Sequence, residues 1–89
     1  MSYRVELSSR AKRELDRVPE ELFRKLDGAI WALQDQPRPS GCVKLKGPIY
    51  RIRVGRWRVI YAVFDRDRLI IVLKVAQRTE QTYKDLPEV

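Results

Sequence analysis

The sequence predicts an α+β domain in which two N-terminal helices pack on one face of a curved, mainly antiparallel four-stranded sheet, in the order β-α-α-β-β-β. Three observations predict it: strand-like alternation at the start of the chain, helical spacing over the next turns, and three runs rich in β-branched and aromatic residues in the second half. At 89 residues, the chain is expected to form one domain over residues 1–89.

The first half of the chain is predicted to contain a short strand followed by two helices. Apolar and polar side chains alternate over residues 3–7, which is the spacing of a half-buried strand. After Ser8 or Ser9 as N-cap, apolar residues recur every three or four positions, as in a helix with one buried face. Pro19 interrupts this pattern and is a favourable first residue for a second helix. We therefore expect a strand over residues 3–7 and helices over residues 9–17 and 19–35.

The second half is predicted to contain three strands joined by short turns, over residues 49–54, 57–64 and 69–76. Gly55 and Arg56 form a two-residue connection with glycine first, as a type II′ hairpin turn requires. With that turn, Arg53 lies opposite Arg58, and Arg51 shares their face of the sheet. Like charges directly opposite each other destabilise a sheet. We therefore interpret these three arginines as an anion-binding face, the alternative being an outer face with solvated side chains.

The net charge of +7 originates in one segment of the chain. Residues 36–64 contain seven basic residues and no acidic one, whereas the remaining residues contain twelve of each sign. Lys44, Lys46 and Arg56 belong to this segment and are candidate RNA-contacting residues. A concentration of one sign indicates a polyanionic partner, either a nucleic acid or an acidic protein segment.

Composition excludes several kinds of site. The chain has no histidine, which excludes Ser–His and Cys–His nucleophile pairs and any histidine-based metal site. Its single cysteine, Cys42, cannot form an internal disulfide, and no segment has the length and hydropathy of a membrane span. We therefore expect a cytoplasmic protein with no membrane partner, no metal and no cofactor.

Residues 45–47, 50–55 and 57–63 resemble the RelE branch of the RelE/ParE toxins, which belong to bacterial and archaeal toxin–antitoxin pairs. Residues 75–83 are similar to the C-terminal segment of the same family, so the resemblance covers essentially the whole chain. It implies the β-α-α-β-β-β fold and a metal-independent endoribonuclease that cleaves mRNA in the ribosomal A site. It also implies a cognate antitoxin protein, encoded nearby, as a partner.

The resemblance further implies which residues form the site. Arg51 and Arg53 match two basic strand positions that flank the scissile phosphate, and Arg58 matches the arginine that stabilises the phosphorane-like charge. Arg78 matches the arginine that assists the leaving group, and Tyr83 the tyrosine that stacks on or orients the nucleotide. Arginine is a poor general base because its pKa is above about 12. Catalysis is therefore expected to depend on electrostatic stabilisation, with Tyr83 or ribosomal RNA handling the proton.

Two other functions are open at this point. The ParE-type branch of the same fold inhibits DNA gyrase by protein–protein contact and cleaves nothing, and a non-catalytic RNA-binding relative would share the basic surface. The strand arginines together with Arg78 and Tyr83 favour the endoribonuclease, because a gyrase inhibitor does not need a set of phosphate-binding side chains.

Overall fold

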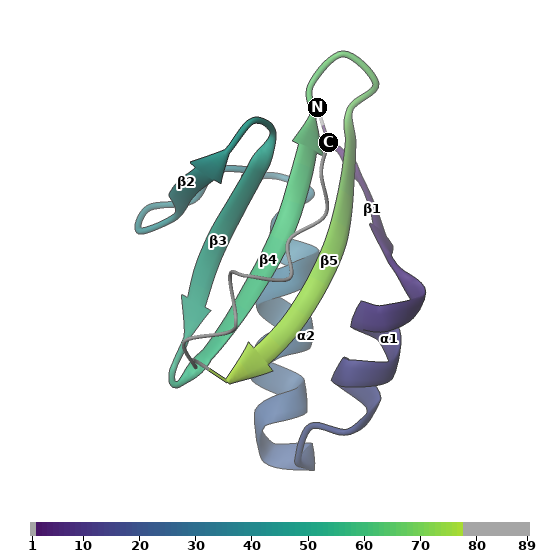
Figure 1. Cartoon of the computed structure of the whole chain (residues 1–89), viewed down its shortest axis with the longest axis vertical. Coiled ribbons are helices and arrows are strands. Elements are labelled where there is room, and N and C mark those ends of the chain that lie inside the picture. Colours follow the sequence, from purple (N-terminus) through teal and green to yellow (C-terminus); the bar gives the residue numbers. More distant parts are fainter. Residues whose placement is uncertain (1, 78–89) are drawn as a thin grey trace.

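The computed structural model describes residues 2–77, which form five strands and two helices in the predicted order with one strand added (Figure 1). The elements are β1 (Arg4–Leu7), α1 (Ser9–Asp16), α2 (Glu20–Ala32), β2 (Val43–Lys46), β3 (Ile49–Val54), β4 (Trp57–Phe64) and β5 (Leu69–Gln77). Both helices lie on the same side of the curved sheet (Figure 1), so the predicted α+β arrangement is confirmed.

The sheet has five strands in the order β1-β5-β4-β3-β2, and the predicted count of four is wrong by one edge strand. Strand β1 is parallel to β5, and every other neighbouring pair is antiparallel. The additional strand, β2, pairs with β3 through Val43 opposite Arg51 and Lys44 opposite Tyr50. Apolar residues and lysines alternate over these four positions, which is a strand signal, but the run is too short to decide the prediction. Lysines are common on edge strands because they discourage pairing with another sheet.

Both predicted helices are present, with ends that differ from the prediction. Ser8 is the N-cap of α1: its Oγ accepts a hydrogen bond of 3.1 Å from the Ala11 amide and donates one of 3.3 Å to the Leu73 carbonyl. Helix α2 begins after Pro19 and ends at Ala32 rather than at residue 35. Residues 33–35 continue as a turn, in which each amide bonds to the carbonyl three positions earlier.

The β3–β4 hairpin has the predicted register. Val54 pairs with Trp57, Arg53 with Arg58 and Arg51 with Ile60. Gly55 has φ +62°, and Arg56 is not among the described residues with positive φ, which is the pattern of a type II′ turn rather than a type I′ turn. The turn therefore places the two arginines directly opposite each other, as expected.

A bulge in β5 determines which side chains of this strand enter the core. Ile60 pairs with Lys74 and Tyr61 with Val72, so Leu73 is an extra residue in the ladder. The extra residue places Val75 against the helices and Lys74 on the other side of the sheet. We call that other side the distal face; it carries Arg51, Arg53, Arg58, Ile60 and Lys74.

The core lies between the helices and the opposite face of the sheet. Leu26, Ile30 and Leu33 of the α2 region pack there against Val59 and Tyr61 of β4. Leu33 is 1% exposed and belongs to the core, whereas Trp31 is 41% exposed.

Candidate active site

The turn end of the β3–β4 hairpin borders a polar cavity of about 460 Å³. Its lining residues are Arg53, Gly55, Arg56, Arg58 and Gln77. Arg53 and Arg58 meet here because they are a cross-strand pair, and Arg56 joins them as the second residue of the turn. The cavity thus brings together three of the predicted site residues, and all three carry a permanent positive charge.

Arg58 is the most unusual side chain of this cavity, because it is 3% exposed although it is charged. Its Nη1 donates to two carbonyl oxygens of the turn region, those of Gly55 at 3.4 Å and Trp57 at 3.1 Å. Its Nε is buried and has no hydrogen-bond partner in the part of the chain that the structure describes. The guanidinium is a rigid planar fork, so with Nη1 engaged, the edge formed by Nε and Nη2 is the one suited to a bidentate oxyanion.

The burial of Arg58 argues against the alternative interpretation, in which all three strand arginines extend into water. Ile60 and Ala62 on the same face are also buried, so this part of the distal face is not a solvated surface. A buried cation with an unsatisfied donor costs free energy, and a like charge opposite it adds to the cost. An anion in the cavity would relieve both costs.

Arg51 and Lys74 extend the positive charge along the distal face beyond the cavity. Arg51 lies opposite Ile60, two residues before Arg53 on the same face, and its Nε is also buried without a partner among residues 2–77. Lys74 lies on the other side of Ile60 and is 6% exposed. Sequence reasoning missed Lys74, because simple alternation through β5 points it toward the helices. The apolar spacing from Val72 to Val75 is the signal that indicates the bulge.

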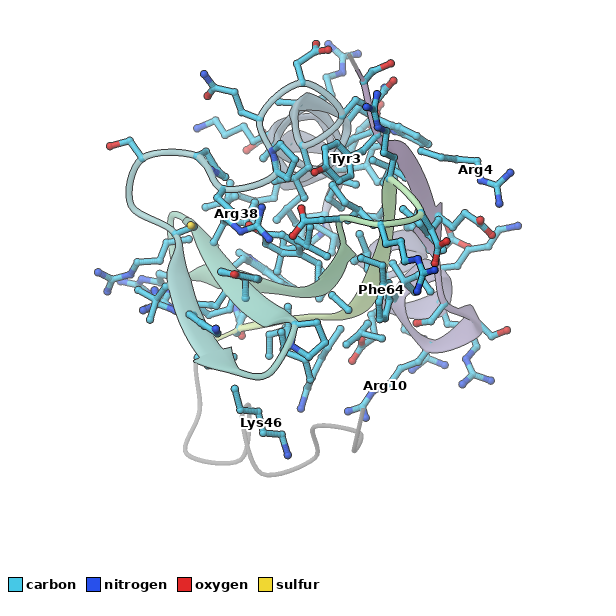
Figure 2. The ribbon with its side chains drawn as sticks, turned by 90° about the horizontal axis from the view of Figure 1, so that it is seen from above. Tyr3, Arg4, Arg10, Arg38, Lys46 and Phe64 are labelled. Carbon is cyan, nitrogen blue, oxygen red and sulfur yellow. The ribbon has the colours of Figure 1, made fainter. Side chains whose placement is uncertain are left out.

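Lys44 and Lys46 lie on the edge strand, away from the cavity. Lys46 pairs with Ile49, at the opposite end of β3 from the turn. Figure 2 shows Lys46 projecting on the side away from α2, whereas the pairing of Lys44 with Tyr50 places Lys44 on the helix side of the sheet. The two lysines therefore do not share one surface. Arg78 and Tyr83 lie outside the described residues.

Arg38 does not belong to the cationic site, although it contributes to the basic segment. Its Nη1 and Nη2 donate to the two carboxylate oxygens of Asp65 at 3.1 and 2.6 Å, and its Nε donates to the Tyr50 hydroxyl at 3.0 Å. The Tyr3 hydroxyl donates to the same carboxylate at 2.7 Å. These bonds, that from Arg38 first, hold the pKa of Asp65 below its ordinary value. They fasten the loop after α2 to the sheet and neutralise one of the seven cations.

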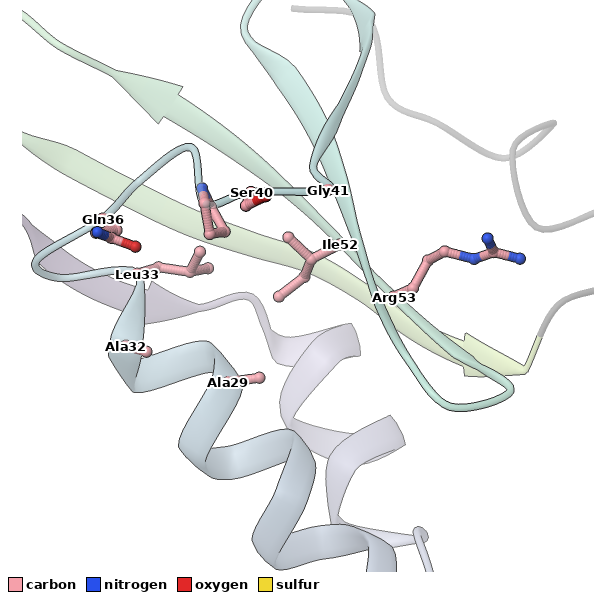
Figure 3. A pocket seen from close by; sticks show the side chains of 9 residues that line it. Ala29, Ala32, Leu33, Gln36, Ser40, Gly41, Ile52 and Arg53 are labelled. Atoms are coloured by element: carbon pink, nitrogen blue, oxygen red, sulfur yellow. The ribbon is translucent and has the colours of Figure 1, made fainter.

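A second, largely apolar groove of about 370 Å³ lies between α2, β3 and the loop after α2 (Figure 3). It is lined by Ala29, Ala32, Leu33, Gln36, Pro39, Ser40, Gly41, Ile52 and Arg53. Figure 3 shows the guanidinium of Arg53 pointing away from α2, so this residue contributes its stem to the groove and its charge to the distal face. Small side chains on α2 leave the space open.

The fold and the arginine-lined cavity define a small basic α+β protein with a binding site suited to an oxyanion. A family model described as the ParE toxin of type II toxin–antitoxin systems, parDE, matches residues 5–82. The chain belongs to this family, within the RelE/ParE superfamily. The resemblance to RelE/ParE toxins in the hairpin segment is therefore confirmed.

Relatives and solved structures agree with this assignment. A Methanocaldococcus jannaschii protein named as a RelE toxin is 34% identical over 90 residues, covering 96% of this chain and 99% of the relative. The archaeal RelE–RelB complex of Pyrococcus horikoshii has 29% identity and a TM-score of 0.77, covering 90% of this chain and 99% of the other. A free-state structure of Escherichia coli RelE has a TM-score of 0.79 at 22% identity, covering 96% and 94%, which supports the fold. None of the described helices is long and apolar enough to cross a membrane.

Proposed function

We propose that this type II toxin is a RelE-type endoribonuclease that cleaves mRNA in the ribosomal A site. In the proposed reaction, a 2′-hydroxyl of the message attacks the adjacent phosphate. The P–O5′ bond breaks, leaving a 2′,3′-cyclic phosphate on one fragment and a 5′-hydroxyl on the other. Such an attack needs little covalent chemistry from the protein and depends on cations placed where phosphoryl charge develops.

The observation that carries the proposal is the buried guanidinium of Arg58, with its Nε unpartnered beside a cavity that Arg53 and Arg56 also line. A fixed guanidinium edge is complementary to two oxygens of a phosphate. Stabilisation of the developing charge by such preorganised donors is a large catalytic contribution that needs no titrating group. This fits a chain without histidine.

The remaining roles follow the family pattern. Arg51 and Arg53 flank the scissile phosphate, Arg78 assists the departing 5′-oxygen, and Tyr83 stacks on or orients the nucleotide. The charge excess of residues 36–64, rather than the family pattern, suggests that Lys44, Lys46 and Arg56 contact the RNA backbone outside the reacting phosphate, with Lys44 doing so from the helix side of the sheet. The proton of the 2′-hydroxyl passes to Tyr83 or to ribosomal RNA, because the arginines are poor bases.

The partners of this proposal are a cognate antitoxin and the translating ribosome in the cytoplasm. Solved structures from Pyrococcus horikoshii and Escherichia coli are complexes of RelE with RelB. An amphipathic segment of the antitoxin would find an apolar surface in the groove beside α2, where Ala29, Ala32 and Ile52 leave room for a large apolar side chain.

Inhibition of DNA gyrase is the second candidate, because the matching family model is that of the ParE toxins. The two functions are separated by primer extension on an mRNA in stalled ribosomes, with a gyrase supercoiling assay in parallel. We expect cuts confined to the A-site codon, and their loss in Arg58→Ala. An absence of cuts combined with inhibited supercoiling would favour gyrase, and inactivity in both assays would favour a non-catalytic RNA-binding protein.

A further inference from the structure

The β3–β4 turn holds one side of the Arg58 guanidinium. Nη1 donates to the carbonyl oxygens of Gly55 and Trp57, at 3.4 and 3.1 Å, while the buried Nε has no partner among the described residues. The planar group cannot rotate about its long axis without breaking these bonds. The turn therefore determines which guanidinium edge is available to a ligand in the cavity that Gly55 and Arg58 both line.

The Gly55 carbonyl is the group whose direction depends on the type of turn. Types I′ and II′ differ mainly in the orientation of the peptide between the two central residues, here Gly55 and Arg56, so its carbonyl reverses direction from one type to the other. The positive φ of Gly55 alone is the II′ pattern. In a type I′ turn the hairpin would keep its two-residue connection, but this carbonyl would point away from Nη1.

We propose that the type II′ turn is the positioning element of the site, with Gly55 as a positioning residue that aims the Nε–Nη2 edge of Arg58 at two oxygens of a phosphate. The expected effect on catalysis rests on the proposed phosphoryl-transfer function. The positioning of the guanidinium requires only that the cavity binds an anion. A positioning role accounts for the turn holding the buried Arg58 guanidinium opposite Arg53, an arrangement that is unfavourable for stability alone.

The test compares two variants of the full chain that both lack the Arg56 charge and differ in turn type. Arg56→Ser keeps glycine first and favours type II′, whereas Gly55→Asn/Arg56→Gly has the sequence preferred by type I′. Circular dichroism melting verifies that both variants fold. Two readouts follow: kcat and KM for A-site cleavage, and the NMR signal of the Arg58 Nε–H during titration with inorganic sulfate. The signal is assigned by its absence in Arg58→Met.

We expect the double variant to have a kcat about 100-fold below that of Arg56→Ser, with KM changed by less than about threefold, because misplacing a group that acts in the transition state costs about this much. Sulfate should shift the Nε–H signal saturably in Arg56→Ser and not in the double variant. If neither variant cleaves mRNA and only Arg56→Ser responds to sulfate, the positioning role of the turn is supported and the nuclease function is refuted. Equal sulfate responses, or none in either variant, would overturn the inference even where kcat differs.

Discussion

Replacing Arg58 by methionine should stabilise the fold while abolishing activity. Methionine is unbranched and flexible, so it can occupy most of the space of the arginine stem without a charge. Arg58 is 3% exposed, has an Nε without a partner among residues 2–77, and faces Arg53 across the hairpin. Each of these features opposes folding, and each disappears in Arg58→Met.

The magnitude follows from opposing contributions. Burying the guanidinium costs several kcal/mol in desolvation, the unsatisfied Nε about 1–3 kcal/mol, and the cross-strand repulsion up to about 1 kcal/mol. The bonds from Nη1 to the Gly55 and Trp57 carbonyls recover part of this, about 1–3 kcal/mol each for a charged donor of good geometry and less at 3.4 Å. We expect a net gain of about 1–2 kcal/mol in the free energy of unfolding. For a domain of this size, that corresponds to a rise in Tm of roughly 5–15 °C.

Urea unfolding and thermal melting followed by circular dichroism measure this gain, with Arg53→Met as the matched control. Arg53 carries the same charge on the same face but is exposed, so its replacement relieves only the repulsion and should change stability by less than about 1 kcal/mol. Low millimolar sulfate should raise the free energy of unfolding of the native protein more than it raises that of the Arg58→Met variant. A loss of stability above about 1 kcal/mol in Arg58→Met, with Arg53→Met unchanged, would refute this reasoning and show that Arg58 serves the fold.

Three further outcomes are expected. If the proposed function holds, Arg53→Ala should lower kcat for A-site cleavage at least about tenfold in primer-extension time courses, since the proposed site loses a cation. An unchanged rate would exclude Arg53 from the site. Because the bonds from Arg38 lower the pKa of Asp65, its contribution to stability is present above about pH 4 and is lost at lower pH. Urea titrations should therefore show the deficit of Asp65→Asn shrinking between about pH 5 and pH 3, and a pH-independent deficit would contradict this. Ala32→Tyr, which fills the apolar groove, should weaken antitoxin binding at least about tenfold by calorimetry. Arg24→Tyr, at an exposed position of α2 that faces away from Ala29 and the groove, should not; equal affinities would place the antitoxin elsewhere.

Most of the fold was predictable because local signals determine it. Ser8 caps α1, Pro19 separates the helices, and the Gly55–Arg56 turn determines the pairing of every residue in the β3–β4 hairpin. Strand β2 was missed, since its alternation of apolar residues and lysines spans four positions, which is too short a signal without the pairing with β3. Its existence is a tertiary effect that overrides a weak local propensity.

The site was predictable only in part, because local periodicity gives the side of a strand but not the depth of a side chain. The shared face of Arg51, Arg53 and Arg58 follows from alternation, and the structure has it. The burial of Arg58 depends on contacts beyond its own hairpin, and the place of Lys74 depends on the β5 bulge. Neither property can be read from the spacing of residues in one strand.

The charge excess of residues 36–64 does not act as one electrostatic patch, because the fold divides it by environment. Arg38 is neutralised by Asp65 and secures a loop, while Lys44 and Lys46 lie on an edge strand at the far end from the turn. Among residues 2–77, desolvated positive charge lies on the distal face, from Arg58 at the turn to Arg51 and Lys74 beside Ile60, and there Coulomb attraction acts through a medium of lower dielectric. An exposed lysine contributes an attraction that salt weakens, whereas Arg58 contributes one that salt weakens little. Raising ionic strength should therefore reduce RNA affinity much more than it reduces the rate of cleavage of bound RNA.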